Sequence, residues 1–218
     1  MNDRPRVKIC GITSVNDARM AVEAGADYLG LNFFGPSPRC IDVERGMEIR
    51  AAVGESVPLV GVFVNHPTDV VAAIDERVGL DFLQFHGDED PASLTPFLAK
   101  AIKVWRVHPG FDVSTVGAFD RCWGFLFDAF NEGLYGGSGR SWDYSHLLDS
   151  GFSGIAADKP VFVAGGLRPE TIAGVADGLP VHAFDVCSGV ESSPGVKDPV
   201  LMRRLFEELR HVETATPT

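Results

Sequence analysis

The chain has 218 residues, 45% of them hydrophobic, and a formal net charge of −11. This charge argues against broad binding of nucleic acid, which requires an excess of Lys and Arg facing the phosphate backbone. No apolar run approaches the roughly 20 residues that span a bilayer, and residues 1–6 are too polar for a signal segment, so we expect a cytoplasmic protein without a membrane partner.

Short apolar strands alternate with amphipathic helices along the chain. Strands are expected to begin near Val7, Asp27, Pro58, Phe82, Ala101, Phe125, Pro160 and Ala183. Helices are expected over residues 15–24, 43–53, 69–78, 91–99, 142–148, 169–176 and 199–212, with a weaker pattern over 112–119. Leu59–Phe63 and Val161–Ala164 are apolar on both faces, which is typical of parallel strands covered on both sides.

Eight strand–helix repeats favour a single-domain (β/α)₈ TIM barrel over residues 1–218, with a doubly wound open sheet as the alternative. We expect residues 214–218 to form a frayed tail. In either architecture the reactive groups lie at the carboxyl ends of the strands.

The first strand ends at Cys10, directly before Gly11, and Thr13 or Ser14 is expected to cap the helix that follows. A thiol at this place can act as base, nucleophile or ligand. Without that context, a buried small hydrophobic residue is the commoner role of a cysteine. A nucleophile–base pair of Cys10 with His86 is a further alternative.

Two more strand ends carry basic side chains. Arg39 ends a loop stiffened by Pro36 and Pro38, and its planar fork suits a carboxylate or a phosphate. The alternative is a solvated surface arginine. His86 follows the fourth strand, and we expect it to lie in the pocket rather than to catalyse.

The sixth strand ends in Asp128, straight after three large apolar residues. Burying an unpaired carboxylate is costly, so its surroundings must supply partners or keep it protonated. We favour a general acid of raised pKa over an aspartate that merely accepts hydrogen bonds from loop amides. The glycine-rich segment 135–141, which includes Gly137, is a lid, an anion cradle or an ordinary loop.

The last two strands are followed by small residues. Gly165 and Gly166 follow the seventh strand, and Ser188 and Gly189 follow the eighth, which itself contains Asp185. Paired glycine-rich turns here commonly build the phosphate site of a barrel. Two unrelated tight turns are the alternative.

The four cysteines do not form a CxxC pair, which argues against a zinc site and for free thiols in a reducing compartment. They are Cys10, Cys40, Cys122 and Cys187.

Taken together, these segments resemble the phosphoribosylanthranilate isomerases of tryptophan biosynthesis. The resemblance runs in order from residue 7 to about 206 and rests on residues 8–13, 37–39, 84–87, 128 with 136–139, 164–167, and 185–191 with 195–198. Two small departures are Phe85, where Leu is usual, and Cys187, where Ser is usual. Neither removes a group that the chemistry requires.

The resemblance implies an Amadori rearrangement of N-(5-phosphoribosyl)anthranilate to 1-(2-carboxyphenylamino)-1-deoxyribulose 5-phosphate. It implies Cys10 as general base, Asp128 as general acid and Arg39 as the partner of the anthranilate carboxylate. We expect substrate contacts from Arg39, His86, Gly137, Gly165, Gly166, Asp185, Ser188 and Gly189.

In this chemistry, protonation of the ribose ring oxygen opens the ring, and the resulting iminium acidifies the C2′ hydrogen. Because the iminium is the substrate's own electron sink, we expect no metal and no organic cofactor. A free thiol has a pKa of about 8.5, so the pKa of Cys10 should be lowered by nearby donors.

Three other functions compete with this one. The related isomerase of the histidine pathway uses an aspartate in place of the cysteine of the first strand, so Cys10 argues against it. Indole-glycerol-phosphate synthase needs a catalytic lysine, for which Lys8 is the only candidate near a strand end. A non-catalytic phosphate-ligand binder requires neither Cys10 nor Asp128. The partner is therefore expected to be a small phosphorylated molecule, bound by a monomer or a homodimer.

Overall fold

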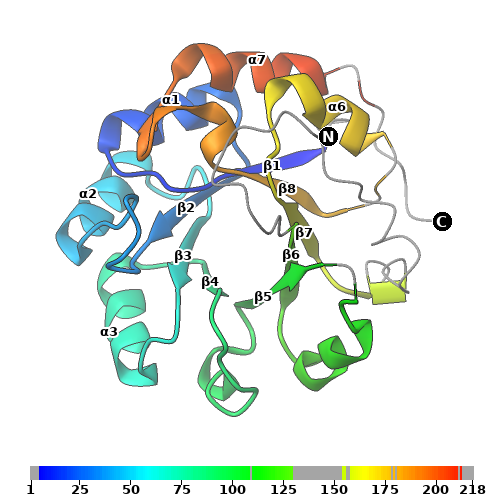
Figure 1. Ribbon diagram of the computed structural model, residues 1–218. Coiled ribbons are helices and arrows are strands. Elements are labelled where there is room, and N and C mark those ends of the chain that lie inside the picture. Colours follow the sequence, from blue (N-terminus) through cyan, green and yellow to red (C-terminus); the bar gives the residue numbers. More distant parts are fainter. Residues whose placement is uncertain are drawn as a thin grey trace.

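The computed structural model describes residues 5–108, 110–129, 154–155, 158–177, 179, 181–210 and 212. Eight parallel strands form a closed barrel in the order of the sequence, which confirms the TIM barrel and rules out the open sheet (Figure 1). The strands are β1 (Arg6–Ile9), β2 (Tyr28–Asn32), β3 (Leu59–Phe63), β4 (Phe82–Phe85), β5 (Ala101–Val107), β6 (Gly124–Ala129), β7 (Val161–Ala164) and β8 (Ala183–Val186). The ring closes where β1 pairs with β8, from Arg6 opposite Ala183 to Ile9 opposite Val186.

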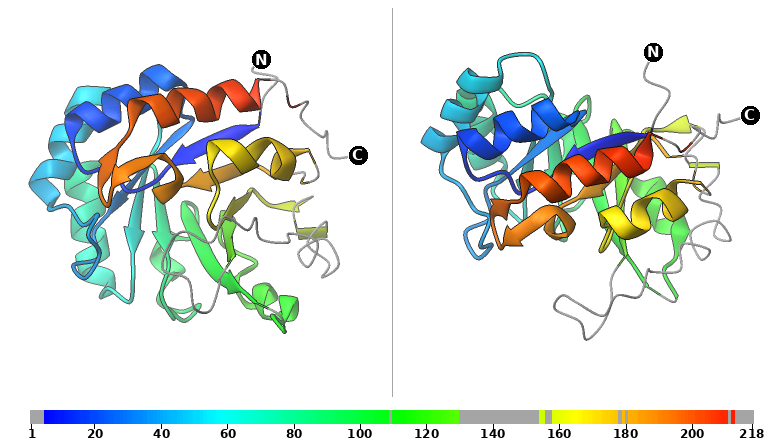
Figure 2. Two further views of the ribbon diagram at one scale, coloured as in Figure 1. Left: turned by 45° about the horizontal axis from the view of Figure 1, so that its top comes forward. Right: turned by 90° about the horizontal axis from the view of Figure 1, so that it is seen from above.

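Helices surround the barrel, and α7 lies between α6 and α1 (Figures 1 and 2). In the described part of the chain they are α1 (Val15–Ala24), α2 (Val43–Val53), α3 (Thr68–Val78), α6 (Pro169–Ala176) and α7 (Pro199–Leu209). Ser14, not Thr13, caps α1 by accepting a 3.0 Å hydrogen bond from the Asp17 amide. Helix α3 begins one residue before the predicted start, and α7 ends at Leu209 rather than at 212. None of the described helices is long and apolar enough to cross a bilayer.

The predicted helix over residues 91–99 is wrong. Only one turn of 3₁₀ helix forms there, η1 (Thr95–Phe97). Pro96 explains the difference, because inside an α-helix it would lack an amide donor and clash with the preceding turn. The weakly patterned segment after β5 forms a longer 3₁₀ helix, η2 (Val113–Phe119). The predicted helix over 142–148 and the predicted tail over 214–218 lie outside the described residues.

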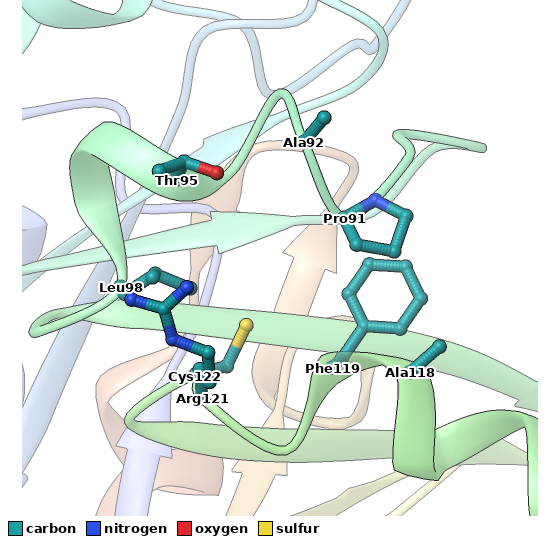
Figure 3. Close-up of a pocket in the computed structure, with 8 residues that line it drawn as sticks. All are labelled: Pro91, Ala92, Thr95, Leu98, Ala118, Phe119, Arg121 and Cys122. Carbon is teal, nitrogen blue, oxygen red and sulfur yellow. The ribbon is translucent and has the colours of Figure 1, made fainter.

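A pocket of about 270 Å³ lies between these two 3₁₀ segments (Figure 3). It is lined by Pro91, Ala92, Thr95, Leu98, Ala118, Phe119, Arg121 and Cys122. All of these residues come from the chain segments around η1 and η2.

A short two-stranded hairpin was not predicted. After β8 the chain forms a 3₁₀ turn, η3 (Ser188–Val190), and then the antiparallel strands β9 (Glu191–Ser193) and β10 (Val196–Lys197). Gly195 makes the turn with a φ of 82°, which a side chain would strain. The hairpin places Glu191 against Arg39, which follows β2, and Gly195 against Thr13, which follows β1.

The barrel interior changes from apolar to polar side chains along its axis. Its apolar layers consist of Tyr28, Val60, Ile102, Val104, Leu126, Phe162, Ala164 and Ala183. Val7 and Ile9 of β1 belong instead to the core between strands and helices. Because side chains alternate along a strand, Lys8 and Cys10 point into the barrel.

Candidate active site

One row of paired residues crosses four strands near their carboxyl ends. Lys8 lies opposite Asp185, Asp185 opposite Ala164, and Ala164 opposite Asp128. Ala164 lines the barrel interior, and its partners in the row face the same way. The strand register therefore directs the Lys8, Asp185 and Asp128 side chains toward one space.

Lys8 and Asp185 form an ion pair of 2.9 Å, with side chains 0% and 8% exposed. Burial alone would lower the pKa of Lys8, but the Asp185 carboxylate and the Cys10 thiolate outweigh it and raise that pKa. Burial raises the pKa of Asp185 to about 7; Lys8 opposes this rise, and the charges of Cys10 and Asp128 add to it. Asp185 thus interacts electrostatically with both predicted catalytic groups and lies between them.

Cys10 is surrounded by groups that stabilise its thiolate. The Cys187 thiol donates a hydrogen bond to it, and the ammonium groups of Lys8 and Lys197 attract it, so the pKa of Cys10 falls well below its usual value although burial opposes the charge. Gly30 leaves the room for this arrangement: a Cβ there would lie 2.8 Å from the Cys10 sulfur and 3.0 Å from Lys8 Nζ. The lowered pKa agrees with what general-base chemistry requires of this thiol.

Asp128 lies at the rim of the barrel, with its side chain 32% exposed. Its carboxylate oxygen is 3.6 Å from Nε2 of His86, and the His86 amide is anchored by a 2.8 Å hydrogen bond to the Phe63 carbonyl. His86 is therefore the partner that we expected Asp128 to need. The same contact places His86 beside the space that Lys8, Asp185 and Asp128 face. Partial exposure reduces the cost of holding a carboxylate beside apolar residues.

Arg39 is not a solvated surface arginine. It donates two hydrogen bonds to Glu191, of 2.8 Å from Nε and 2.6 Å from Nη2. Lys197 donates a third to the same carboxylate at 2.9 Å. Burial would raise the pKa of Glu191, but Arg39 and Lys197 outweigh it and lower that pKa. The guanidinium thus already faces an internal carboxylate, and a substrate carboxylate must use its remaining N–H groups or displace Glu191.

Gly11 makes this convergence of loops feasible. It adopts a φ of 72°, and a Cβ there would lie 2.6 Å from Arg39 Cδ and 3.1 Å from the Cys187 sulfur. The turn after β1 therefore contacts both the Arg39 loop and the residues after β8.

The glycine-rich turns after β7 and β8 lie against each other. A Cβ on Gly189 would be 1.9 Å from the Leu167 carbonyl oxygen, so the contact excludes any side chain at that position. Gly165 and Gly166 adopt φ values of 118° and 64°, and Gly166 and Ser188 are exposed. The two turns form one surface, as a shared phosphate site requires. Gly137 lies outside the described residues.

Three charged residues of this region have no role in the reaction that the sequence favours: Lys8, which was considered only for a competing function, Glu191 and Lys197. Lys8 carried a usable signal, because an ammonium inside an otherwise apolar strand requires a buried carboxylate nearby. Glu191 and Lys197 carried none until the hairpin brought them together.

No three metal-ligating side chains lie close enough to hold an ion in the part of the chain that the structure describes. That the reaction needs no metal follows from the electron sink in the substrate, and it stays a prediction.

Comparison with known proteins gives a consistent result. A family model described as N-(5'phosphoribosyl)anthranilate (PRA) isomerase matches residues 7–208. The N-(5'-phosphoribosyl)anthranilate isomerase of Acidithiobacillus ferrooxidans is 44% identical over 206 residues, which cover 94% of this chain and 97% of that protein.

Solved structures agree. Monomers generated from the dimeric phosphoribosylanthranilate isomerase of Thermotoga maritima superpose with a TM-score of 0.81 at 29% identity, covering 95% of this chain and 99% of that one. A phosphoribosylanthranilate isomerase bound to reduced 1-(o-carboxyphenylamino)-1-deoxyribulose 5-phosphate gives a TM-score of 0.82 at 29% identity, covering 94% and 98%.

Proposed function

The chain belongs to the N-(5'-phosphoribosyl)anthranilate isomerase family, and from this premise we propose that Cys10 and Asp128 are the general base and general acid of its reaction. The activity is the isomerisation of N-(5'-phosphoribosyl)anthranilate in tryptophan biosynthesis. One observation supports the assignment above the others. Asp185 lies on β8, one of the two strands between β6 and β1, and interacts electrostatically with both Cys10 and Asp128, which supports a single substrate sugar that reaches both groups.

The first step is ring opening. A protonated Asp128 gives its proton to the ribose ring oxygen as the C1′–O bond breaks, and the anthranilate nitrogen donates its electron pair to form a C1′ iminium. His86, 3.6 Å from the Asp128 carboxylate, orients that carboxyl group. Proton transfer of this kind typically contributes about 10²–10⁴-fold.

The second step removes the C2′ hydrogen. The Cys10 thiolate takes this proton, the C–H electrons form a C1′–C2′ double bond, and the iminium π electrons return to nitrogen. The enol-amine then tautomerises to the ketone: the Cys10 thiol gives its proton to C1′, the C2′ hydroxyl gives its proton to the Asp128 carboxylate, and both catalytic groups return to their starting forms. Lys8 and Cys187 keep the thiol ionised before the proton transfer.

The remaining predicted residues bind the two ends of the substrate. The N–H groups of Arg39 that Glu191 leaves free hold the anthranilate carboxylate. The turns with Gly165, Gly166, Ser188 and Gly189 hold the phosphate, and Gly137 is proposed as a further substrate-binding residue. Asp185 faces the ribose. In an Arg39→Lys variant we expect KM to rise more than kcat falls, because the planar fork is lost while the charge remains.

The competing functions are weakened by the same geometry. Lys8 is locked against Asp185 with no exposed surface, so it is unsuited to act on substrate as a catalytic lysine. A non-catalytic binder has no need of a thiol held as thiolate.

A fluorescence assay tests the proposal. Purified protein should convert freshly made phosphoribosylanthranilate, with loss of anthranilate-type fluorescence. Cys10→Ala and Asp128→Asn should each lower kcat about 10²–10⁴-fold and still bind the reduced product analogue. Tight binding of the analogue by an unmodified protein that shows no turnover would establish the binder instead. Undiminished turnover in both variants would refute the two roles.

We also infer a cytoplasmic protein, because all four cysteines are free thiols, and a monomer or a homodimer. The Thermotoga maritima relative is described as dimeric. Sedimentation equilibrium of the purified chain decides between the two states, and a larger assembly would contradict both.

A further inference from the structure

A second cysteine lies beside Cys10 on the neighbouring strand. The β1–β8 ladder ends with Ile9 opposite Val186, and the Cys10 amide continues it with a 2.8 Å hydrogen bond to the Val186 carbonyl. Cys10 and Cys187 are therefore the next residues of the two strands. Neighbouring strands are about 4.8 Å apart, and Cα atoms joined by a disulfide are about 4.4–6.8 Å apart.

The two thiols also interact electrostatically. The Cys187 thiol is the group that most lowers the pKa of Cys10, its sulfur lies 3.9 Å from Glu191 Oε1, and both residues are partly exposed. Lys197 holds the Cys187 backbone in place with a 3.1 Å hydrogen bond to its carbonyl. Cys40 and Cys122 differ from Cys10: burial raises the pKa of Cys40 and raises that of Cys122 to about 11, so neither is held as a thiolate.

We propose that Cys10 and Cys187 form a site of reversible oxidation, in which a peroxide converts the two thiols into a disulfide. The Cys10 thiolate attacks one peroxide oxygen, the O–O bond breaks, and hydroxide leaves, which gives a sulfenic acid at Cys10. The Cys187 sulfur then attacks the Cys10 sulfur, the S–OH bond breaks, and water leaves with the Cys187 proton. In total, two thiols and one hydrogen peroxide give one disulfide and two waters. A dithiol reductant reverses the bond by exchange.

The disulfide has two consequences. It removes the thiolate, so turnover stops. It also protects Cys10, because a sulfenic acid without a neighbouring thiol proceeds to sulfinic and sulfonic acids that thiols do not reduce. Formation of the bond does not depend on Cys10 being the catalytic base, whereas the loss of turnover does.

Mass spectrometry combined with the activity assay distinguishes formation of the disulfide from the loss of turnover. The full-length protein is treated with hydrogen peroxide, alkylated while unfolded, and measured as intact protein and as peptides. We expect two of the four thiols to escape alkylation, a peptide linking Cys10 with Cys187, and recovery of both thiols and turnover with dithiothreitol. Formation of the linked peptide without loss of turnover would leave the modification site standing and refute Cys10 as the base.

Two variants serve as controls, each compared with its own untreated sample. Cys187→Ser should gain oxygen atoms at Cys10 and recover neither thiol nor turnover with dithiothreitol. Cys40→Ser should form the same linked peptide as the unmodified protein. The proposal is overturned if the unmodified protein gains oxygen at Cys10 without a disulfide, if the bond includes Cys40 or Cys122, or if Cys187→Ser recovers as fully as the parent.

Discussion

The two ends of the barrel interior are built from different chemistry. At the amino end of the strands, aromatic rings pack against one another. The ring centroid of Phe162 lies 5.3 Å from that of Tyr28, edge to face, and 5.3 Å from that of His182, while the centroids of Trp123 and Phe82 are 4.1 Å apart. His182 is neutral there, since burial lowers its pKa to about 4. It accepts a hydrogen bond from Arg6 and shares another with the Tyr28 hydroxyl at 2.7 Å.

At the carboxyl end, buried charges replace the rings. Lys8 pairs with Asp185, and Glu191 with Arg39 and Lys197. Buried ion pairs contribute little net stability, because desolvation offsets the attraction. The comparison teaches that the amino end provides the stability of the fold, while the carboxyl end holds charge in place for catalysis.

The largest expected effect is a loss of stability when an aromatic ring is removed from the amino end of the barrel interior. Phe162 is fully buried in the barrel interior, so Phe162→Ala removes ring contacts and leaves a cavity. We expect unfolding free energy to fall by about 3–5 kcal/mol, with kcat of the folded protein nearly unchanged. Urea unfolding and the fluorescence assay measure the two quantities. A loss of kcat as large as that in Cys10→Ala would mean that the ends are not separable.

The Lys8–Asp185 ion pair at the carboxyl end can be removed in two steps, first one partner and then both. Lys8→Met leaves Asp185 buried without its ammonium partner, and we expect a loss of about 3–5 kcal/mol of stability. The loss should be smaller at about pH 6 than at about pH 8, because a protonated Asp185 needs no such partner. Lys8→Met/Asp185→Leu should recover most of the stability and none of the turnover. Recovery of turnover in the double variant would contradict a catalytic purpose for the pair.

The pH dependence of turnover reports the charge environment of Cys10. Activity rises as the thiol ionises, so the acid limb of kcat/KM should lie below the ordinary thiol pKa of about 8.5. In Lys8→Met the limb should move to higher pH, because one ammonium that favours the thiolate is gone. An acid limb at or above the ordinary value in the unmodified protein would contradict the assignment.

The smallest expected effect belongs to His182. Its pKa is about 6.5 in the unfolded chain and about 4 when folded, so the unfolded state binds a proton that the folded state does not. Stability from this group is therefore complete above pH 6.5 and is lost as pH falls toward about 4. His182→Gln should flatten this part of the stability curve, as measured by unfolding between those two pH values. An unchanged slope would mean that His182 is not held neutral.

The barrel was predictable because its signals are local and repeated. Apolar runs bounded by glycine and proline marked all eight strands, and an N-cap residue such as Ser14 marked where a helix begins. The prediction of an α-helix over 91–99 was wrong because it followed the apolar pattern and neglected Pro96, which is unfavourable inside a helix. The placement of Cys10 and Asp128 at the carboxyl ends of their strands followed from the predicted fold alone.

The charged network was not predictable in the same way. Whether Glu191 meets Arg39 depends on a hairpin only seven residues long, from Glu191 to Lys197, and on the close approach that Gly11 permits. The contact between Cys10 and Cys187 depends on the register of β1 against β8, and no spacing within the sequence encodes that register.

The central claim is that Cys10 and Asp128 face one pentose from two sides. A crystal structure of this chain with the reduced product analogue tests it directly. The account predicts the Cys10 sulfur within about 4 Å of C2′ and an Asp128 oxygen within hydrogen-bond distance, about 2.5–3.0 Å, of the hydroxyl that the ring oxygen becomes. An analogue that contacts only one of these side chains, with the other turned into a separate cavity, would contradict it.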